Sequence, residues 1–240
     1  MADALFEQPR LAAIYDDLDR DRSDLDVYAR IAEELGARSV LDVGCGTGTF
    51  AVMLAAVGID VTGVDPASAS LDVARRKPAA ERVRWIHGDA RALPALAVDL
   101  ATMTGNVAQA ITEEPEWRAT LRGIHDALRP GGHLVFETRD PARKAWLEWT
   151  RARSYEETEI TGLGTVEHWA DLTVVDLPLV SWRWTFVFPD GDVIGSESTL
   201  SFREREDVHS ALVEHGYVVD EIRGAPDRPG REFVFFARRP

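Results

Sequence analysis

A regular alternation of apolar and amphipathic segments between residues 39 and 138 is the feature that most constrains the fold. The apolar segments are SVLDV, IDVTGVD, VRWIHGD, AVDLATM and GHLVFET, and the amphipathic segments between them include FAVMLAAVG, ASLDVARR and EPEWRATLRGIHDALR. Near-continuous apolar runs, such as residues 40–43 and 134–136, are typical of strands that are buried on both faces. Because strands that alternate with helices need crossover connections, the pattern predicts a doubly wound α/β fold with five parallel strands.

The flanking segments show other patterns. Residues 1–36 are rich in acidic side chains, but their apolar residues recur at helical spacing, which predicts a helical segment that ends at Gly36. Between about residues 163 and 202 polar and apolar residues alternate, which predicts an antiparallel insertion of about three strands. The chain then returns to a helix at residues 204–215, followed by two closing strands at 217–222 and 232–237.

Length and composition exclude several classes of protein. At roughly 150 residues per domain, 240 residues are enough for one large domain with additions. The net charge of −14 disfavours nucleic acid as a partner, because such partners require Lys and Arg against phosphates. No apolar run is long enough to span a membrane, and the start MADALFEQPR does not resemble a secretory signal. With a single cysteine, Cys45, an internal disulfide is impossible, and we expect a cytoplasmic protein.

A glycine-rich turn joins the first predicted strand to the helix that follows it. The motif VLDVGCGTGTF contains Gly44, Gly46 and Gly48, and glycines at such a turn let a ligand approach backbone amides and the helix N-terminus. The dinucleotide fingerprint G-x-G-x-x-G would place the third glycine one residue later, which weakens an NAD interpretation. Asp65 ends the second strand, where a carboxylate can accept hydrogen bonds from both hydroxyls of a ribose. The pattern predicts a ribose-bearing ligand.

From about residue 36 to 138 the chain resembles the class I S-adenosylmethionine-dependent methyltransferases. VLDVGCGTG matches the glycine-rich motif of that family, VTGVDPA its ribose-binding strand end and IHGDA its adenine-side motif, while LRPGGHLVFE is a common accompaniment. The resemblance implies S-adenosylmethionine as cofactor and S-adenosylhomocysteine as product. It also implies a Rossmann-like, seven-stranded, mostly parallel sheet whose last strand, at residues 232–237, is antiparallel.

The resemblance assigns a role to each matching residue. The glycine motif would line the methionine and ribose parts of the cofactor, and Asp42 beneath it would hold the turn or the ammonium group of the ligand. Asp65 would accept from the ribose hydroxyls, and Asp89 from the adenine amino group. The residues after the fourth strand would lie near the methyl donor. The expected cofactor-binding residues are Asp42, Gly44, Cys45, Gly46, Gly48, Asp65, Pro66, Asp89, Ala90, Thr104, Gly105 and Asn106.

These patterns divide the chain into four segments. They are a helical N-terminal segment (1–36), a cofactor-binding core (37–142), an antiparallel β insertion that forms the substrate region (143–203), and a C-terminal helix with the closing strands of the core (204–240). The insertion could cover the active site as a lid or form a homodimer interface, because exposed strand edges invite pairing.

The catalytic residues are less strongly indicated. Methyl transfer from a sulfonium is an in-line displacement that mainly requires alignment, so we expect no metal and no covalent intermediate. His168 is a candidate general base, with an ordinary strand histidine as the alternative. Tyr15 resembles the tyrosine of the N-terminal segment that folds over the cofactor in related enzymes, with core packing as an equal alternative. Cys45 has no neighbouring base in the sequence, so we do not expect it to be a nucleophile.

Candidate substrate residues lie at the end of the fifth strand and in the insertion. Glu137 and Arg139 end that strand at the edge where ligands bind, although surface ionic residues are the alternative. Among the many aromatic residues we expect Trp149 and Trp169 to reach the substrate pocket. A second set should form the core of the insertion, because strand alternation places its members on one face; these are Trp182, Trp184, Phe186 and Phe188.

The sequence therefore predicts a methyltransferase that acts on nitrogen or oxygen of a small organic molecule. The acidic composition slightly favours a cationic or amine-bearing acceptor. Thr104-Gly105-Asn106-Val107 departs from the Asn/Asp-Pro-Pro-aromatic motif of methyltransferases that modify nucleic-acid bases or glutamine. Two alternatives stay open: an NAD-dependent oxidoreductase, and a non-catalytic module that binds S-adenosylmethionine and regulates a partner.

Overall fold

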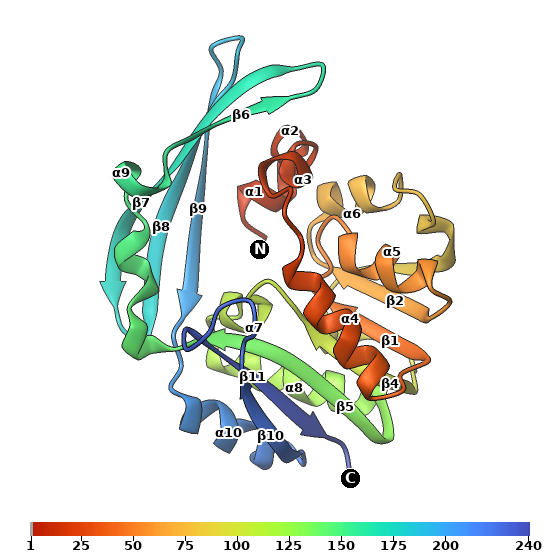
Figure 1. Ribbon diagram of the computed structural model, residues 1–240. Helices are drawn as coiled ribbons and strands as arrows, with labels where there is room; N and C mark the ends of the chain where they lie inside the picture. The colour runs from red at the N-terminus through yellow and green to blue at the C-terminus, as the bar shows by residue number, and fades with distance from the viewer. Residues whose placement is uncertain (1) are drawn as a thin grey trace.

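The computed structural model describes residues 2–240, and its core is a seven-stranded sheet with the order β10-β11-β5-β4-β1-β2-β3 (Figure 1). β1 pairs in parallel with β2 and β4, β2 with β3, and β4 with β5, whereas β11 is antiparallel to both β5 and β10. The predicted fold class is confirmed, including the antiparallel last strand. The strands are β1 (Ser39–Val43), β2 (Asp60–Asp65), β3 (Val83–His87), β4 (Val98–Met103), β5 (Leu128–Arg139), β10 (Val218–Gly224) and β11 (Glu232–Arg238).

Helices cover both faces of this sheet, as the near-continuous apolar strands require. On one face Trp117, Leu121 and Ile124 of α8 pack with Leu134 and Phe136 of β5. On the other face α4 and α5 pack against the alternate residues of the same strands, including Val135. The helices of the core are α4 (Asp24–Glu34), α5 (Thr49–Ala56), α6 (Ser68–Ala74), α7 (Val107–Ala110), α8 (Glu114–Ala127) and α10 (Arg205–Glu214), with the 3₁₀ turns η1 (Ala80–Arg82) and η2 (Ala90–Ala92).

The insertion forms a second, antiparallel sheet of four strands in the order β6-β7-β8-β9. We predicted about three strands, and the additional one is β6, whose sequence EETEI is rich in glutamate. Glutamate is depleted in strands, but charged side chains on an edge strand discourage pairing with other chains. The strands are β6 (Glu156–Ile160), β7 (Gly164–Asp176), β8 (Leu179–Val187) and β9 (Val193–Ser201), preceded by η3 (Pro141–Arg143), η4 (Ala145–Glu148) and α9 (Arg151–Ser154).

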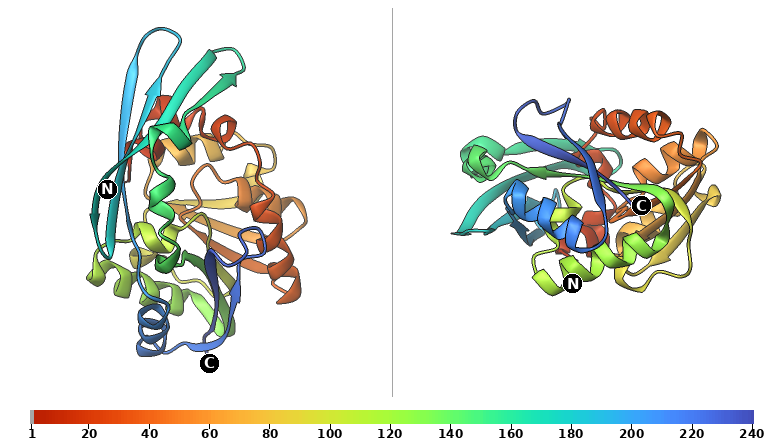
Figure 2. Two further views of the ribbon diagram at one scale, coloured as in Figure 1. Left: turned by 60° about the vertical axis from the view of Figure 1, so that its left-hand side comes forward. Right: turned by 90° about the horizontal axis from the view of Figure 1, so that it is seen from below.

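Three short helices lie between the two sheets in Figures 1 and 2: α1 (Ala4–Glu7), α2 (Pro9–Ala12) and α3 (Tyr15–Leu18). Leu11 and Ile14 of this segment pack with Phe186 and Phe188 on the inner face of the second sheet. Arg10 also forms ion pairs with Asp190 and Asp192 in the turn between β8 and β9. The N-terminal segment thus fixes the insertion against the core.

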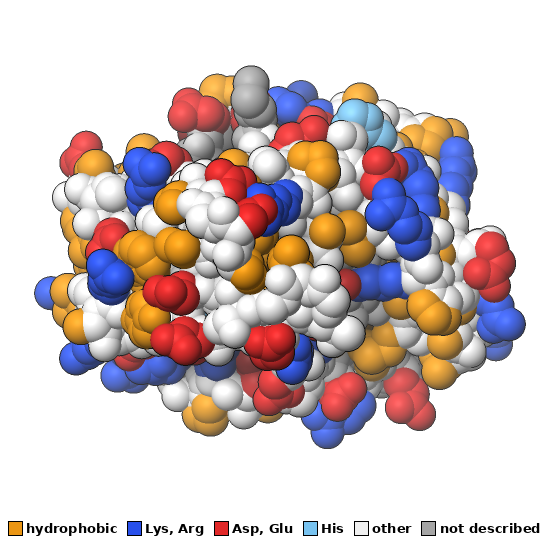
Figure 3. Space-filling model, turned by 90° about the horizontal axis from the view of Figure 1, so that it is seen from above, with side chains coloured by type: hydrophobic (Ala, Val, Ile, Leu, Met, Phe, Trp, Pro, Cys, Tyr) orange, Lys and Arg blue, Asp and Glu red, His pale blue; other side chains and the backbone are white. Residues whose placement is uncertain are grey.

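The surface seen from above in Figure 3 carries acidic and basic side chains interspersed with one another. Within residues 2–240, no helix combines the length and the apolar character that a membrane span requires.

Candidate functional site

A cavity of ≈ 320 Å³ lies at the carboxyl edge of the parallel strands. Its lining comes from residues 42–47 after β1, 64–66 after β2, 88–91 after β3, and 104, 105 and 107 after β4. The N-terminal segment contributes Ala2, Asp3, Phe6, Tyr15 and Arg22 on the opposite side. This is the place where an open α/β sheet binds ligands, because the loops diverge there and leave a crevice.

The glycine turn at this edge needs its glycines for two physical reasons. Gly44, Gly46 and Gly48 have φ values of 71°, 52° and 76°, which side chains disfavour. A Cβ on Gly48 would lie 2.4 Å from the Trp85 ring, whereas a Cβ on Gly46 would meet no atom within 4 Å. The turn therefore packs closely on one side and is open at Gly46. Burial raises the pKa of the Cys45 thiol beside it well above the usual value, which disfavours the reactive thiolate.

Asp65 at the end of β2 is buried and holds two backbone amides. Its Oδ1 accepts a hydrogen bond from the amide of Ala67 at 2.7 Å, and its Oδ2 accepts one from the amide of Gly46 at 2.8 Å. Burial raises the pKa of the carboxyl, which these two amides oppose. Each carboxylate oxygen keeps lone-pair capacity for a further donor. The geometry suits two hydroxyl donors from a ribose, and Pro66 follows on the cavity wall.

Asp42 is the least satisfied acid of the cavity. It is 1% exposed, and its Oδ1 accepts a hydrogen bond from the Thr102 hydroxyl at 3.2 Å. Its Oδ2 is buried and receives no hydrogen bond from residues 2–240. Burial raises the pKa of this carboxyl to about 7. A cationic donor in the cavity would satisfy the free oxygen.

Asp89 lies on the cavity wall, but its carboxylate already has a partner. The Arg91 guanidinium contacts Oδ2 at 2.6 Å and the Arg91 amide donates to Oδ1 at 2.8 Å. The hydrogen bond from the Arg91 side chain lowers the pKa of Asp89. An adenine amino group would therefore share this carboxylate with Arg91. Ala90 follows as a buried residue against which α8 packs at Gly123.

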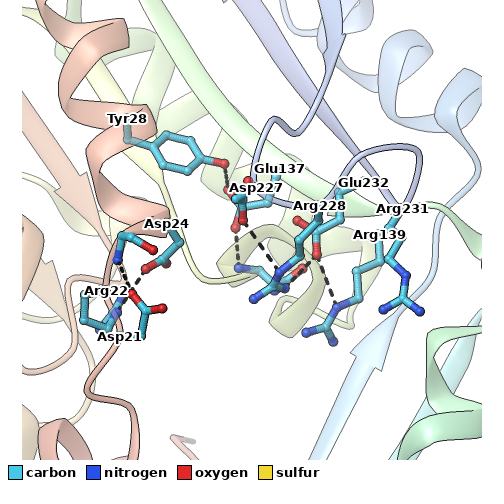
Figure 4. A network of polar contacts seen from close by, with 12 residues as sticks. Asp21, Arg22, Asp24, Tyr28, Glu137, Arg139, Asp227, Arg228, Arg231 and Glu232 are labelled. Carbon is cyan, nitrogen blue, oxygen red and sulfur yellow. Dashed lines mark hydrogen bonds and ion pairs between the residues drawn. The ribbon is translucent and has the colours of Figure 1, made fainter.

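The loop after β4 has some residues in the cavity wall and others in the protein interior. Thr104 and Gly105 line the cavity, whereas Asn106 is buried with φ 65° and is absent from the lining. The amide of Asn106 donates to Oε1 of Glu137 at 2.6 Å, and the hydroxyl of Tyr28 donates to Oε2. Glu137 is thus an interior acid that organises this loop (Figure 4), and the expectation that it faces the substrate is not met. Burial raises its pKa to about 7.

Two of the expected catalytic and substrate residues lie away from the cavity. His168 is 5% exposed on the inner face of the second sheet, where it contacts the hydroxyl of Thr158 at 3.0 Å and stacks on Phe186. Burial lowers its pKa, and its surroundings are those of a histidine in the core of the second sheet. Because adjacent strand residues point to opposite faces, Trp169 lies on the outer face, where its indole NH donates to Asp171.

Of Tyr15, Arg139 and Trp149, only Tyr15 reaches the cavity. Tyr15 lines it, with its ring 5.5 Å from that of Phe6, and burial raises its pKa to about 12. Arg139 forms an ion pair with Glu232 at 3.5 Å, and its guanidinium lies 5.5 Å from the ring of Trp149. Arg139 and Trp149 are not in the cavity lining itself.

Sequence reasoning missed Asp3, Phe6 and Arg22, which line the cavity from the N-terminal segment. Arg22 interacts electrostatically with Asp42, although the two residues are far apart in the chain. The segment carried an acidic helical pattern and no motif, so no sequence signal distinguished these three residues from surface side chains.

Comparison with known proteins places the match in the first half of the chain. A family model described as a methyltransferase domain matches residues 40–132. Cypemycin N-terminal methyltransferase from Streptomyces sp is 39% identical over 109 residues, which cover 45% of this chain and 44% of that protein. A ubiquinone biosynthesis O-methyltransferase from Pectobacterium carotovorum is 33% identical over 122 residues, covering 48% and 49%. The chain spans about half the length of the curated relatives it matches.

Solved structures share the whole architecture. An S-adenosylmethionine-dependent methyltransferase from Clostridium acetobutylicum has a TM-score of 0.75 at 18% identity, covering 95% of this chain and 97% of that one. A sugar N-methyltransferase from Streptoalloteichus sp has a TM-score of 0.74 at 22% identity, covering 94% and 93%. At these identities the likeness establishes a common fold.

Proposed function

We propose that this chain is a class I S-adenosylmethionine-dependent methyltransferase, as the matching methyltransferase domain supports, and that it transfers a methyl group to a nitrogen or oxygen atom of a small organic molecule. The names of similar proteins support both atoms, since they include an N-terminal methyltransferase, a sugar N-methyltransferase and an O-methyltransferase. The core of the chain supports a cofactor site at the glycine turn.

The buried, unpartnered Oδ2 of Asp42 is the observation that carries this proposal. A buried acceptor without a donor costs about 1–3 kcal/mol, so a ligand that supplies a donor there binds with that advantage. S-adenosylmethionine has an ammonium group on its methionine part that fits this oxygen. Arg22 lines the same cavity and interacts with Asp42. A carboxylate beside a guanidinium complements an amino-acid zwitterion, which fits the methionine end of the cofactor.

Asp65 supports the same orientation of the ligand. Both of its oxygens already accept from backbone amides, and their remaining lone pairs point to a diol as the natural partner. We assign Asp65 to the ribose, with the open side of Gly46 next to it. The bound cofactor supplies a methyl group that a sulfonium already activates, so the protein has to align and enclose the reactants.

Tyr15 and Phe6 enclose the cavity from the N-terminal side. With a pKa of about 12, the Tyr15 phenol stays protonated at neutral pH, so it can donate a hydrogen bond but cannot act as a base. We propose that Tyr15 orients the methyl acceptor through this hydrogen bond. Phe6 packs against its ring and excludes water from the reacting atoms.

Calorimetric titration with S-adenosylhomocysteine, with NAD as a parallel ligand, tests the cofactor assignment. Asp65→Ala should weaken binding by about 1.5–3 kcal/mol, roughly 10- to 150-fold, because a charge-assisted hydrogen-bond acceptor is lost. Asp60→Ala is the matched control, since Asp60 begins the same strand but is exposed. Binding of NAD alone, or equal affinity for S-adenosylhomocysteine in Asp65→Ala and the wild type, would contradict the proposal.

The acceptor is tested separately by turnover. Amines and phenols are incubated with S-adenosylmethionine, and the release of S-adenosylhomocysteine is measured. Release that depends on an added acceptor supports an enzyme. Cofactor binding without turnover of any acceptor would favour the non-catalytic alternative.

A further inference from the structure

Three arginines from distant parts of the chain belong to the network of polar contacts in Figure 4. Arg22 precedes α4, Arg139 ends β5, and Arg228 lies in the loop between β10 and β11. Oε1 of Glu232 lies 3.5 Å from Nε of Arg139 and 2.9 Å from Nη1 of Arg228. Asp24, 3.3 Å from Nε of Arg22, also interacts electrostatically with Arg228. Glu232 is thus shared by Arg139 and Arg228, whereas Asp24 pairs with Arg22 and affects Arg228 only through its charge. We call these three residues the arginine row.

The outer nitrogens of this row have unused hydrogen-bonding capacity. Arg139 forms its ion pair through Nε, and neither of its Nη atoms donates a hydrogen bond to any residue from 2 to 240. Arg22 pairs in the same way, through Nε with Asp24 and Asp19. These two side chains are only 21% and 22% exposed. Half-buried guanidinium donors that have no partner in the protein are available to a ligand that supplies acceptors.

Arg139 is not required to neutralise Glu232. Glu232 is 5% exposed, and the contact with Arg228 at 2.9 Å already supplies it with a cation. The longer contact of Arg139 leaves its planar fork directed away from Glu232, as Figure 4 shows. Asp227 balances part of the charge of Arg228 at 3.6 Å. Arg139 therefore carries the least compensated charge of the row, and both of its Nη atoms, like those of Arg22, have no hydrogen-bond partner among residues 2–240.

An aromatic surface adjoins this charge. The ring of Trp149 lies 5.5 Å from the Arg139 guanidinium and 4.3 Å from the ring of Trp182 on the second sheet. Arg22 lines the cavity, and Arg139 ends β5 at the same carboxyl edge of the sheet, where ligands of such folds bind.

We propose that Arg139 and Arg228 bind an oxyanion of the methyl acceptor, a carboxylate or a phosphate group, and that Trp149 packs against the body of the same molecule. This inference rests on the proposed function, since it names the class of acceptor for that site. It departs from the cationic acceptor that the net charge of −14 favours. Net charge describes the whole surface, whereas recognition depends on the charges that face the ligand.

The test uses the full chain saturated with S-adenosylhomocysteine and two matched probes, phenyl phosphate and phenol. Calorimetry should give binding of phenyl phosphate and much weaker binding of phenol. Arg139→Gln should weaken phenyl phosphate binding about tenfold or more, because a charged bidentate donor is lost. Arg139→Lys retains the charge but lacks the planar fork of donors. Its affinity for phenyl phosphate should therefore lie between those of the wild type and Arg139→Gln. Arg231→Gln is the control, since Arg231 is exposed and pairs with the exposed Glu148.

Each outcome bears on a separate part of the inference. Equal binding of phenyl phosphate by Arg139→Gln and wild type, or phenol binding as tightly as phenyl phosphate, would overturn the oxyanion site. Benzoate is titrated in parallel, and binding of benzoate in place of phenyl phosphate supports a carboxylate acceptor. If S-adenosylhomocysteine binds but neither anion does, this inference fails alone. If S-adenosylhomocysteine itself does not bind, the proposed function fails, and an Arg139-dependent anion site would lose its role in methyl transfer.

Discussion

Replacement of Asp42 by asparagine should stabilise the ligand-free protein and weaken its binding of cofactor. Burial raises the pKa of Asp42 from 3.8 to about 7. A carboxyl whose pKa is higher in the folded state destabilises that state wherever it is ionised, so the cost grows as pH rises from about 4 to 7 and is complete above it. At about 1.4 kcal/mol per unit, the cost is on the order of 4 kcal/mol above neutrality. Asparagine has no charge to bury, so Asp42→Asn avoids this cost.

Cofactor binding should show the opposite dependence on pH. The ionised form of Asp42 attracts the ammonium group, so the affinity of the wild type for S-adenosylhomocysteine should rise with pH up to about 7 and then level. One pH unit below the pKa, only about a tenth of the carboxyls are ionised, which predicts roughly tenfold weaker binding. In Asp42→Asn this dependence should disappear, and binding at pH 8 should be weaker than in the wild type by about 1.5–3 kcal/mol.

Denaturant unfolding at pH 6 and pH 8 measures the stability effect, and calorimetry at the same pH values measures the affinity. Glu137→Gln is the control, because Glu137 has a similarly raised pKa but lies outside the cavity lining. It should keep the pH dependence of binding. If Asp42→Asn bound S-adenosylhomocysteine with wild-type affinity at pH 8, Asp42 would not be the partner of the ammonium group.

Two further predictions concern the walls of the cavity. Gly48→Ala combines a positive φ with a Cβ 2.4 Å from the Trp85 ring, whereas Gly46→Ala has the backbone strain without a clash. Gly48→Ala should therefore lower the free energy of unfolding by more than Gly46→Ala, as measured by denaturant unfolding. Equal losses of stability would show that the clash at Gly48 is relieved. Lys77→Met removes the 2.7 Å ion pair to Asp16 and should loosen the N-terminal segment. Limited proteolysis should then cleave this segment faster than in the wild type. An unchanged rate of cleavage would mean that the apolar contacts of the segment are enough to hold it in place.

The sequence predicted the core because its local signals agree with one another. Apolar strands, the glycine turn and the acid that ends β2 each constrain a short stretch of chain, and the parallel sheet brings their ends to one edge. The strand β6 was missed because its glutamates suit an exposed edge better than an average strand. The positions of His168 and Trp169 outside the cavity lining could not be predicted, because the face to which a strand residue points depends on register and on what covers each face. Nothing in the sequence of the insertion predicts that the N-terminal segment packs beside Phe186.

The arginine row shows a different limit of sequence reasoning. Arg22, Arg139 and Arg228 belong to three segments that meet only in the folded chain. Each residue has an ordinary sequence context, and only Arg139 was singled out, from its place at the end of β5. A site built by convergence has no local pattern, so only the spatial arrangement of ion pairs and unused donors reveals it.

Unsatisfied polar groups in the described chain concentrate near the carboxyl edge of the parallel strands, and that of Asp42 belongs to a residue that lines the cavity. Of the four buried side-chain atoms without a partner, those of Asp42, Asn106 and Thr138 lie at or just after the carboxyl ends of β1, β4 and β5, and only that of Trp117 lies on a helix. Each such group costs about 1–3 kcal/mol in the free protein. A ligand that satisfies one of them recovers this cost on binding and shifts the unfolding equilibrium toward the folded state. The free protein should therefore be less stable than its core packing alone would make it, because Asp42 keeps a buried oxygen that a ligand in the cavity can satisfy.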